Sequence, residues 1–69
     1  MEILFKNRLQ QLRKEKGLTQ TELAQVLKTT QRRISYMELG IVEPDLATLI
    51  SLSKFFEVST DFLIGIKDY

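Results

Sequence analysis

Apolar residues recur along this chain at the spacing of amphipathic helices, and glycines or small polar residues separate the runs. The first run carries apolar residues at positions i, i+4 and i+7: Phe5, Leu9 and Leu12. This spacing places them on one side of a helix over residues 5–16. Gly17 can adopt the left-handed conformation that ends a helix, and Leu18 can fold back against the last turn.

The next two runs predict short helices joined by a tight turn. Thr19 and Glu22 fit a capping box, in which each side chain accepts a hydrogen bond from the other residue's backbone amide. That helix is expected to reach about Leu27. Thr30 can cap the following helix, and Gly40 can end it. The apolar residues expected to pack the two helices together are Leu23, Ala24, Leu27, Ile34 and Met37.

The second half of the chain predicts two more helices. Pro44 and Asp45 suit the first turn and the cap of a fourth helix. Its core stripe is expected at Leu46, Leu49, Leu52, Ser53 and Phe56. Ser59 can cap a short fifth helix that Gly65 ends, which leaves residues 66–69 as a tail. No run alternates apolar and polar residues as a strand does, so the sequence predicts an all-α fold with five helices.

Composition narrows the function of such a fold. The 69 residues, of which 43% are hydrophobic and 28% charged, are typical of one small globular domain over residues 1–69. The chain has no cysteine and no histidine, so it lacks the usual zinc ligands and general bases. We therefore expect no catalytic residues, no metal and no cofactor. No stretch approaches the roughly 20 apolar residues of a membrane span and no signal peptide is evident, so we expect a soluble, cytoplasmic protein.

The net charge of +1 hides a strong segregation of charge along the chain. Residues 1–33 hold eight Lys or Arg against three acidic residues, whereas residues 34–69 hold two against six. Such an asymmetry favours one face that binds a polyanion and another face that binds something else.

The predicted helix over residues 31–39 carries polar side chains that its packing does not require. In a helix-turn-helix the second helix enters the major groove of DNA, and its N-terminal residues lie nearest the base edges. A glutamine amide can bridge N6 and N7 of adenine, and an arginine can bridge O6 and N7 of guanine. The candidate base-reading residues are Gln31, Arg32, Ser35 and Tyr36. We therefore expect a transcriptional regulator, acting as a repressor at the nucleoid, that binds a double-stranded DNA operator.

A second set of polar residues is placed for the DNA backbone. Gln20 lies in the first turn of the preceding helix, where its side-chain amide and the free backbone amides favour an anion. Lys28 in the turn and Arg33 in the next helix are expected to contact phosphates, which adds affinity without sequence information.

At these positions the sequence resembles the lambda-type Cro/repressor helix-turn-helix family, also called the xenobiotic-response-element family. The resemblance covers about residues 9–65 and is carried mainly by Leu12, Arg13, Gly17, Leu18, Thr19, Gln20, Glu22, Leu23, Ala24, Leu27, Thr30, Ile34, Met37, Glu38, Gly40, Pro44, Leu46, Leu49, Val58, Ser59, Leu63 and Gly65. It implies a compact, repressor-like domain whose second and third helices form the helix-turn-helix, and which usually binds palindromic operators as a dimer. It also implies phosphate contacts from Gln20 and Thr30, and a structural ion pair between Arg13 and Glu38.

Several residues depart from the family pattern. Lys28 replaces a glycine common in the turn, so either this residue takes a strained positive φ, which would cost ~1 kcal/mol, or the turn differs. Leu39 replaces a frequent asparagine, and Ile41 and Val42 stand where polar or basic residues are common. Phosphate contacts from that loop are therefore not expected.

The chain has more apolar residues than a core of this size can absorb, which indicates an interface. We expect a two-fold homodimer contact away from the recognition helix, built by Phe55, Phe62, Ile66 and Tyr69; otherwise these residues fill the core. Two other interpretations stay open. One is a protein-interaction module of the same fold, such as an antitoxin or a repressor antagonist, and the other is a fragment of a longer regulator. A protein antagonist would be a further partner.

Overall fold

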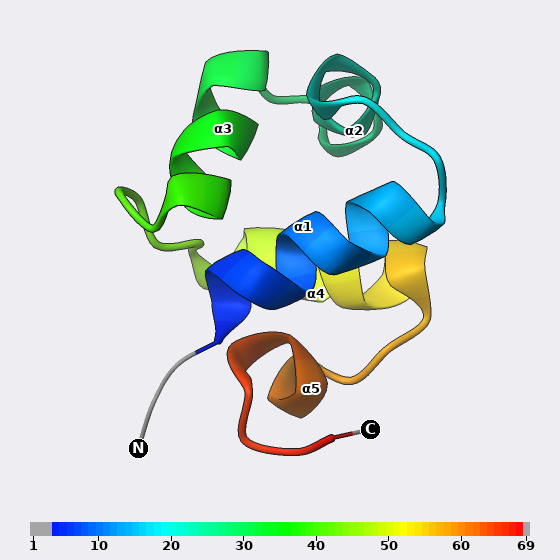
Figure 1. Ribbon diagram of the computed structural model, residues 1–69, viewed down its shortest axis with the longest axis vertical. Helices are drawn as coiled ribbons and strands as arrows, with labels where there is room; N and C mark the ends of the chain where they lie inside the picture. The colour runs from blue at the N-terminus through cyan, green and yellow to red at the C-terminus, as the bar shows by residue number, and fades with distance from the viewer. Residues whose placement is uncertain (1–3, 69) are drawn as a thin grey trace.

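The computed structural model describes residues 4–68, whose arrangement is shown in Figure 1. These residues form five α-helices and no strand: α1 (Phe5–Glu15), α2 (Gln20–Leu27), α3 (Gln31–Leu39), α4 (Leu46–Phe56) and α5 (Thr60–Ile64). The predicted all-α fold with five helices is confirmed, and the helix bounds agree closely with the predicted ones. None of these helices is long and apolar enough to cross a membrane.

One apolar core holds the five helices together. α1 and α4 cross the middle of the molecule, with α2 and α3 on one side of them and α5 on the other (Figure 1). Every helix contributes to this core, whose fully buried side chains include Leu9, Leu23, Ile34, Met37, Leu52 and Leu63. Burial of one such side chain contributes about 1.5–3 kcal/mol relative to exposure. The core therefore fixes the position of α3 relative to the rest of the domain.

Local hydrogen bonds set where the helices begin. Thr19 and Glu22 form the predicted capping box: the Glu22 amide donates to the Thr19 hydroxyl at 3.0 Å, and the Thr19 amide donates to the Glu22 carboxylate at 2.9 Å. The hydrogen bond from the Thr19 amide lowers the pKa of the Glu22 carboxyl below its ordinary value. The side chains of Thr30, Asp45 and Ser59 cap α3, α4 and α5, each by accepting a hydrogen bond from the backbone amide three residues later. Each such cap contributes about 1 kcal/mol.

Among residues 4–68, two residues other than glycine adopt the left-handed conformation, each where a helix ends. Lys28 closes α2 at φ 56° and ψ 44°, and the Thr29 amide then donates to the Ala24 carbonyl at 2.9 Å. Of the two alternatives for this turn, the strained positive φ is the one observed. Glu57 closes α4 at the same φ and ψ. Both residues lack the conformational freedom that glycine has in this region.

The start of α1 is fastened to the end of α5. The Leu4 amide donates a hydrogen bond to the Ile64 carbonyl at 3.2 Å. Gly65 follows at φ 89°, and a Cβ added there would lie only 2.9 Å from the Leu4 Cβ. Gly65 therefore both ends α5 and allows the two segments to approach each other.

One predicted core position is wrong, because Leu46 is 78% exposed. A helical side chain covers the turn on the N-terminal side of its own Cα. Leu46 is the first residue of α4, so its side chain extends past the end of the helix and away from the core. The other predicted positions of this stripe are buried or partly buried: Leu49, Leu52, Ser53 and Phe56.

Candidate nucleic-acid interface

α2 and α3 form a helix-turn-helix whose packing follows the predicted apolar positions. Leu23, Ile34 and Met37 have no exposed surface, and Ala24 is 3% exposed. Leu27 is partly buried against the same cluster. The inner side of α3 contacts both α1 and α2. The opposite side of α3, including its N-terminal end, is left open to a partner.

The four candidate base-reading residues lie along α3 and differ in exposure. Gln31 and Arg32, at the N-terminal end, are exposed. Tyr36, one turn later, is 37% exposed, and Ser35 is half-buried. Gln31 and Arg32 are therefore the freest of the four to reach a base edge, and Ser35 is the most restricted by the scaffold.

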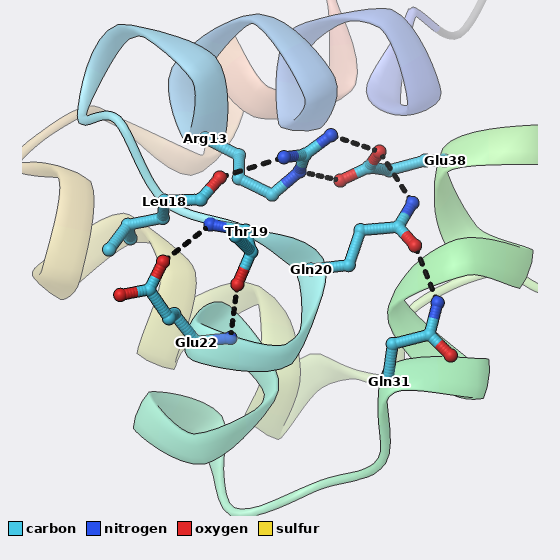
Figure 2. Close-up of polar contacts among 7 residues, drawn as sticks. All are labelled: Arg13, Leu18, Thr19, Gln20, Glu22, Gln31 and Glu38. Atoms are coloured by element: carbon cyan, nitrogen blue, oxygen red, sulfur yellow. Dashed lines mark hydrogen bonds and ion pairs between the residues drawn. The ribbon is translucent and has the colours of Figure 1, made fainter.

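Gln31 is hydrogen bonded to the start of the preceding helix. Its Nε2 donates to the Gln20 Oε1 at 2.6 Å, and the Gln20 Nε2 donates in turn to the Glu38 Oε1 at 3.1 Å (Figure 2). Gln20 is half-buried and Glu38 is buried. The first residue of α2 and the first residue of α3 are thus held together by their side chains as well as by the core beneath them.

The inner end of this chain is the ion pair that the family resemblance implied. Arg13 on α1 donates from Nε and Nη2 to the two carboxylate oxygens of Glu38, at 2.6 and 3.0 Å. Its third donor, Nη1, reaches the Leu18 carbonyl at 2.8 Å. The two side chains are only 11% and 3% exposed. Because all three guanidinium nitrogens of Arg13 donate within the fold, Arg13 is a scaffold residue and is not free to read a base. The hydrogen bond to Glu38 also raises the pKa of Arg13 above its ordinary value.

The candidate phosphate-binding residues surround the turn, but they are not equally free. Lys28 is exposed, and the Thr30 hydroxyl already accepts the Arg33 backbone amide at 3.2 Å. The Arg33 guanidinium lies 3.7 Å from the Asp45 carboxylate. Hydrogen bonding to Thr48, with a smaller contribution from Arg33, lowers the pKa of the Asp45 carboxyl. Exposed ion pairs of this kind are weak, so a phosphate can compete with Asp45 for Arg33.

The residues predicted to form a dimer contact are partly used within the monomer. Phe55 packs edge-on against Phe56 with ring centroids 5.0 Å apart, and the Lys16 Nζ lies 4.9 Å from the Phe55 ring. Phe62 is partly buried against the core, and Ile66 is 49% exposed. Tyr69 lies outside the described residues. The largest exposed apolar side chains instead include those of Leu39, Ile41, Leu46 and Ile50.

Sequence reasoning missed the role of Arg8. Its guanidinium lies over the Phe62 ring at 4.1 Å and donates to the Phe62 and Lys67 carbonyls at 3.3 and 3.4 Å. It also contacts the Asp68 carboxylate at 3.4 Å. Because these partners are 54 to 60 residues away in the sequence, no local pattern indicates them. Arg8 therefore fastens the end of the described chain to α1.

Known proteins share both the sequence pattern and the fold. Residues 9–63 match the helix-turn-helix family HTH_3. The SPbeta prophage-derived HTH-type transcriptional regulator YonR of Bacillus subtilis is 43% identical over 61 residues, which cover 88% of this chain and 56% of that protein. This chain thus spans about half the length of the curated relatives that it matches.

Solved structures support the same assignment. A transcriptional regulator from Listeria innocua superposes with a TM-score of 0.90 at 34% identity, over 94% of this chain and 61% of that one. The P22 c2 repressor, solved in complex with synthetic operator 9T, superposes with a TM-score of 0.84 at 27% identity, over 91% of this chain and 96% of that one. With the α2–α3 geometry described above, these matches establish that the chain belongs to the helix-turn-helix (HTH_3) family.

Proposed function

We propose that this protein binds double-stranded DNA in a sequence-specific manner and acts as a transcriptional regulator, in the first instance a repressor at the nucleoid. The observation that carries the proposal is the N-terminal end of α3, where Gln31 is held beside α2 by its hydrogen bond to Gln20 and where both Gln31 and Arg32 are exposed. The similarity to the P22 c2 repressor, whose structure contains an operator, extends over almost the whole of that chain. No catalytic role is proposed.

In this proposal α3 lies in the major groove with its N-terminal end nearest the bases. Gln31 presents an amide that matches the N6 and N7 edge of adenine, and Arg32 presents a guanidinium that matches the O6 and N7 edge of guanine. Each such bidentate contact is worth about 1–3 kcal/mol of discrimination. Tyr36 and Ser35 lie further along the groove, where they contact a thymine methyl group or the backbone.

The DNA backbone is held by donors around the turn. The second amide hydrogen of Gln20, the Thr30 hydroxyl and the Lys28 ammonium can each meet a phosphate beside the groove. The unpaired backbone amides at the starts of α2 and α3 favour the same negative charge. Arg33 joins them when a phosphate displaces Asp45. These contacts fix the orientation of α3 but do not select a sequence.

Two copies are proposed to bind one palindromic operator. The two recognition helices of such a dimer lie about 34 Å apart, which is one turn of DNA. The described part of one copy measures 29 × 24 × 21 Å, so two copies placed side by side can span that distance. The homodimer contact predicted at Phe55, Phe62, Ile66 and Tyr69 remains part of this proposal, with Ile66 its most exposed described member.

Selection of bound duplexes from a random pool tests the proposal directly. We expect an enriched inverted repeat and a binding constant that falls steeply with salt concentration. A second candidate function, a protein-interaction module, is favoured by the exposed Leu39, Ile41 and Leu46 in and beside the α3–α4 loop. If the pool yields no enriched sequence while the protein still captures a protein antagonist, the second function replaces the first.

A further inference from the structure

Four side chains form a continuous chain of hydrogen bonds from the interior to the N-terminal end of α3. The chain runs from Arg13 to Glu38, then to Gln20 and finally to Gln31, with donor–acceptor distances of 2.6 to 3.1 Å. Arg13 belongs to α1, Gln20 to α2, and both Glu38 and Gln31 to α3. Figure 2 shows that their side chains follow one another from Arg13 to Gln31. We refer to these four residues as the relay.

The chemistry of the inner end of the relay sets the direction of every hydrogen bond beyond it. A carboxylate can only accept hydrogen bonds, whereas a glutamine amide can donate from nitrogen or accept at oxygen. Since the Glu38 carboxylate meets Gln20, Gln20 must turn its nitrogen inward and its oxygen outward. Gln31 must then turn its nitrogen towards Gln20. Replacement of the carboxylate by an amide would remove this constraint.

Arg13 and Glu38, at the inner end of the relay, are held rigidly by burial and hydrogen bonds, whereas Gln31, at the outer end, is exposed. Both oxygens of Glu38 are held by Arg13, and Arg13 is itself fixed by the Leu18 carbonyl. The exposed Gln31 would otherwise sample several rotamers, as long polar side chains do. Its Oε1 and its second amide hydrogen have no partner among residues 4–68. Those two atoms are the ones that Gln31 can offer to a base.

We propose that Glu38 is a positioning residue for base readout: acting through Gln20, its carboxylate fixes which end of the Gln31 amide faces each atom of the base. The inference rests on the proposed DNA-binding function and assigns to a scaffold residue a share of the sequence specificity. In the fixed orientation the Gln31 Oε1 can accept from N6 of adenine, and the second amide hydrogen of Gln31 can donate to N7. In the reversed orientation the donor and the acceptor exchange places and the match is lost.

The test measures a preference rather than an affinity. The selected duplex is compared with a duplex in which the adenine read by Gln31 is replaced by another base, and the ratio of the two dissociation constants is determined for each variant. Wild type is expected to prefer the selected duplex by about 5- to 150-fold. A merely structural role of Glu38 would lower binding to both duplexes and leave this ratio unchanged.

Three relay variants and one control are compared below their melting temperatures. Glu38→Gln keeps the size of the side chain but allows the amides to reverse, and Gln20→Met removes the link while leaving the Arg13–Glu38 pair intact. Gln31→Ala removes the reader. Ser53→Ala, which deletes a hydrogen bond to the Val58 carbonyl in another part of the fold, controls for loss of stability. If Glu38→Gln does not fold, Gln20→Met carries the test alone.

We expect Glu38→Gln and Gln20→Met to lower the preference at this one base pair several-fold, and Ser53→Ala to retain it. In the Gln31→Ala background, Glu38→Gln is expected to cause no further loss of preference. The inference is overturned if Glu38→Gln and Gln20→Met both keep the wild-type ratio, if the effect of Glu38→Gln persists without Gln31, or if Gln31→Ala alters no position of the selected motif. Failure of wild type to select any motif would instead overturn the proposed function, and this inference with it.

Discussion

Lys28 and Glu57 provide a matched pair of sites for separating stability from DNA binding. Both residues end a helix, and both have φ 56° and ψ 44°. A residue other than glycine costs roughly 1–2 kcal/mol in this conformation. Glycine removes that strain but gives the unfolded chain more freedom, which offsets about 0.5–1 kcal/mol. Lys28→Gly and Glu57→Gly should therefore each stabilise the domain by about 0.5–1 kcal/mol.

The two variants should differ when DNA is added. Lys28 lies in the turn between α2 and α3 and is proposed to contact a phosphate, whereas Glu57 lies at the end of α4. Loss of one phosphate contact reduces the slope of log K against log salt concentration by about one. Lys28→Gly should thus bind all duplexes more weakly with a smaller salt dependence, despite its greater stability. Glu57→Gly should keep the wild-type salt dependence.

Thermal unfolding and salt titration of operator binding measure the two effects separately. A gain of 1 kcal/mol raises Tm by about 4–8 °C in a domain of this size, so each variant should melt roughly 2–8 °C above wild type. If both variants melt below wild type, the strain argument is wrong. If Lys28→Gly keeps the full salt slope, Lys28 does not contact a phosphate.

Four further substitutions test individual assignments. Arg32→Ala should lower the preference for the correct base at one base pair by about 1–3 kcal/mol, and competition between duplexes measures this loss. Arg33→Ala should weaken binding to all sequences alike and reduce the slope of log K against log salt concentration by about one, which a salt titration measures. If Arg32→Ala selects the same motif as wild type, Arg32 does not read a base. Asp45→Asn keeps the α4 cap but removes the carboxylate whose pKa is lowered. Because a lowered pKa stabilises the fold above the ordinary value of 3.8 and this contribution is lost as pH falls through the folded value, Asp45→Asn should flatten the acid limb of Tm against pH. Ile66→Asp should disrupt the proposed homodimer in sedimentation without lowering Tm greatly, and an unchanged dimer would place the contact elsewhere.

Features that depend on residues close in sequence could be predicted from the sequence. The capping box at Thr19 and Glu22 and the ends of α2 and α3 each require groups within a few residues of one another. The exposure of Leu46 could not be predicted. Its spacing fits the apolar stripe of α4, but spacing alone does not show whether another helix packs against the first turn. The hydrogen bonds of Gln20 to Gln31 and Glu38 span 11 and 18 residues, and they depend on how α2 and α3 pack.

The excess of cations in the first half of the chain does not all form a surface for a polyanion. Arg8 and Arg13 belong to the basic half, yet both are turned towards acceptors within the fold. Lys16 lies over the Phe55 ring. These cations contribute to folding and offer little to a polyanion, because their charge is already partly matched or directed elsewhere. In the proposed DNA complex, the exposed Lys28 and the free amides at the start of α3 are therefore expected to contribute more to affinity than these three cations.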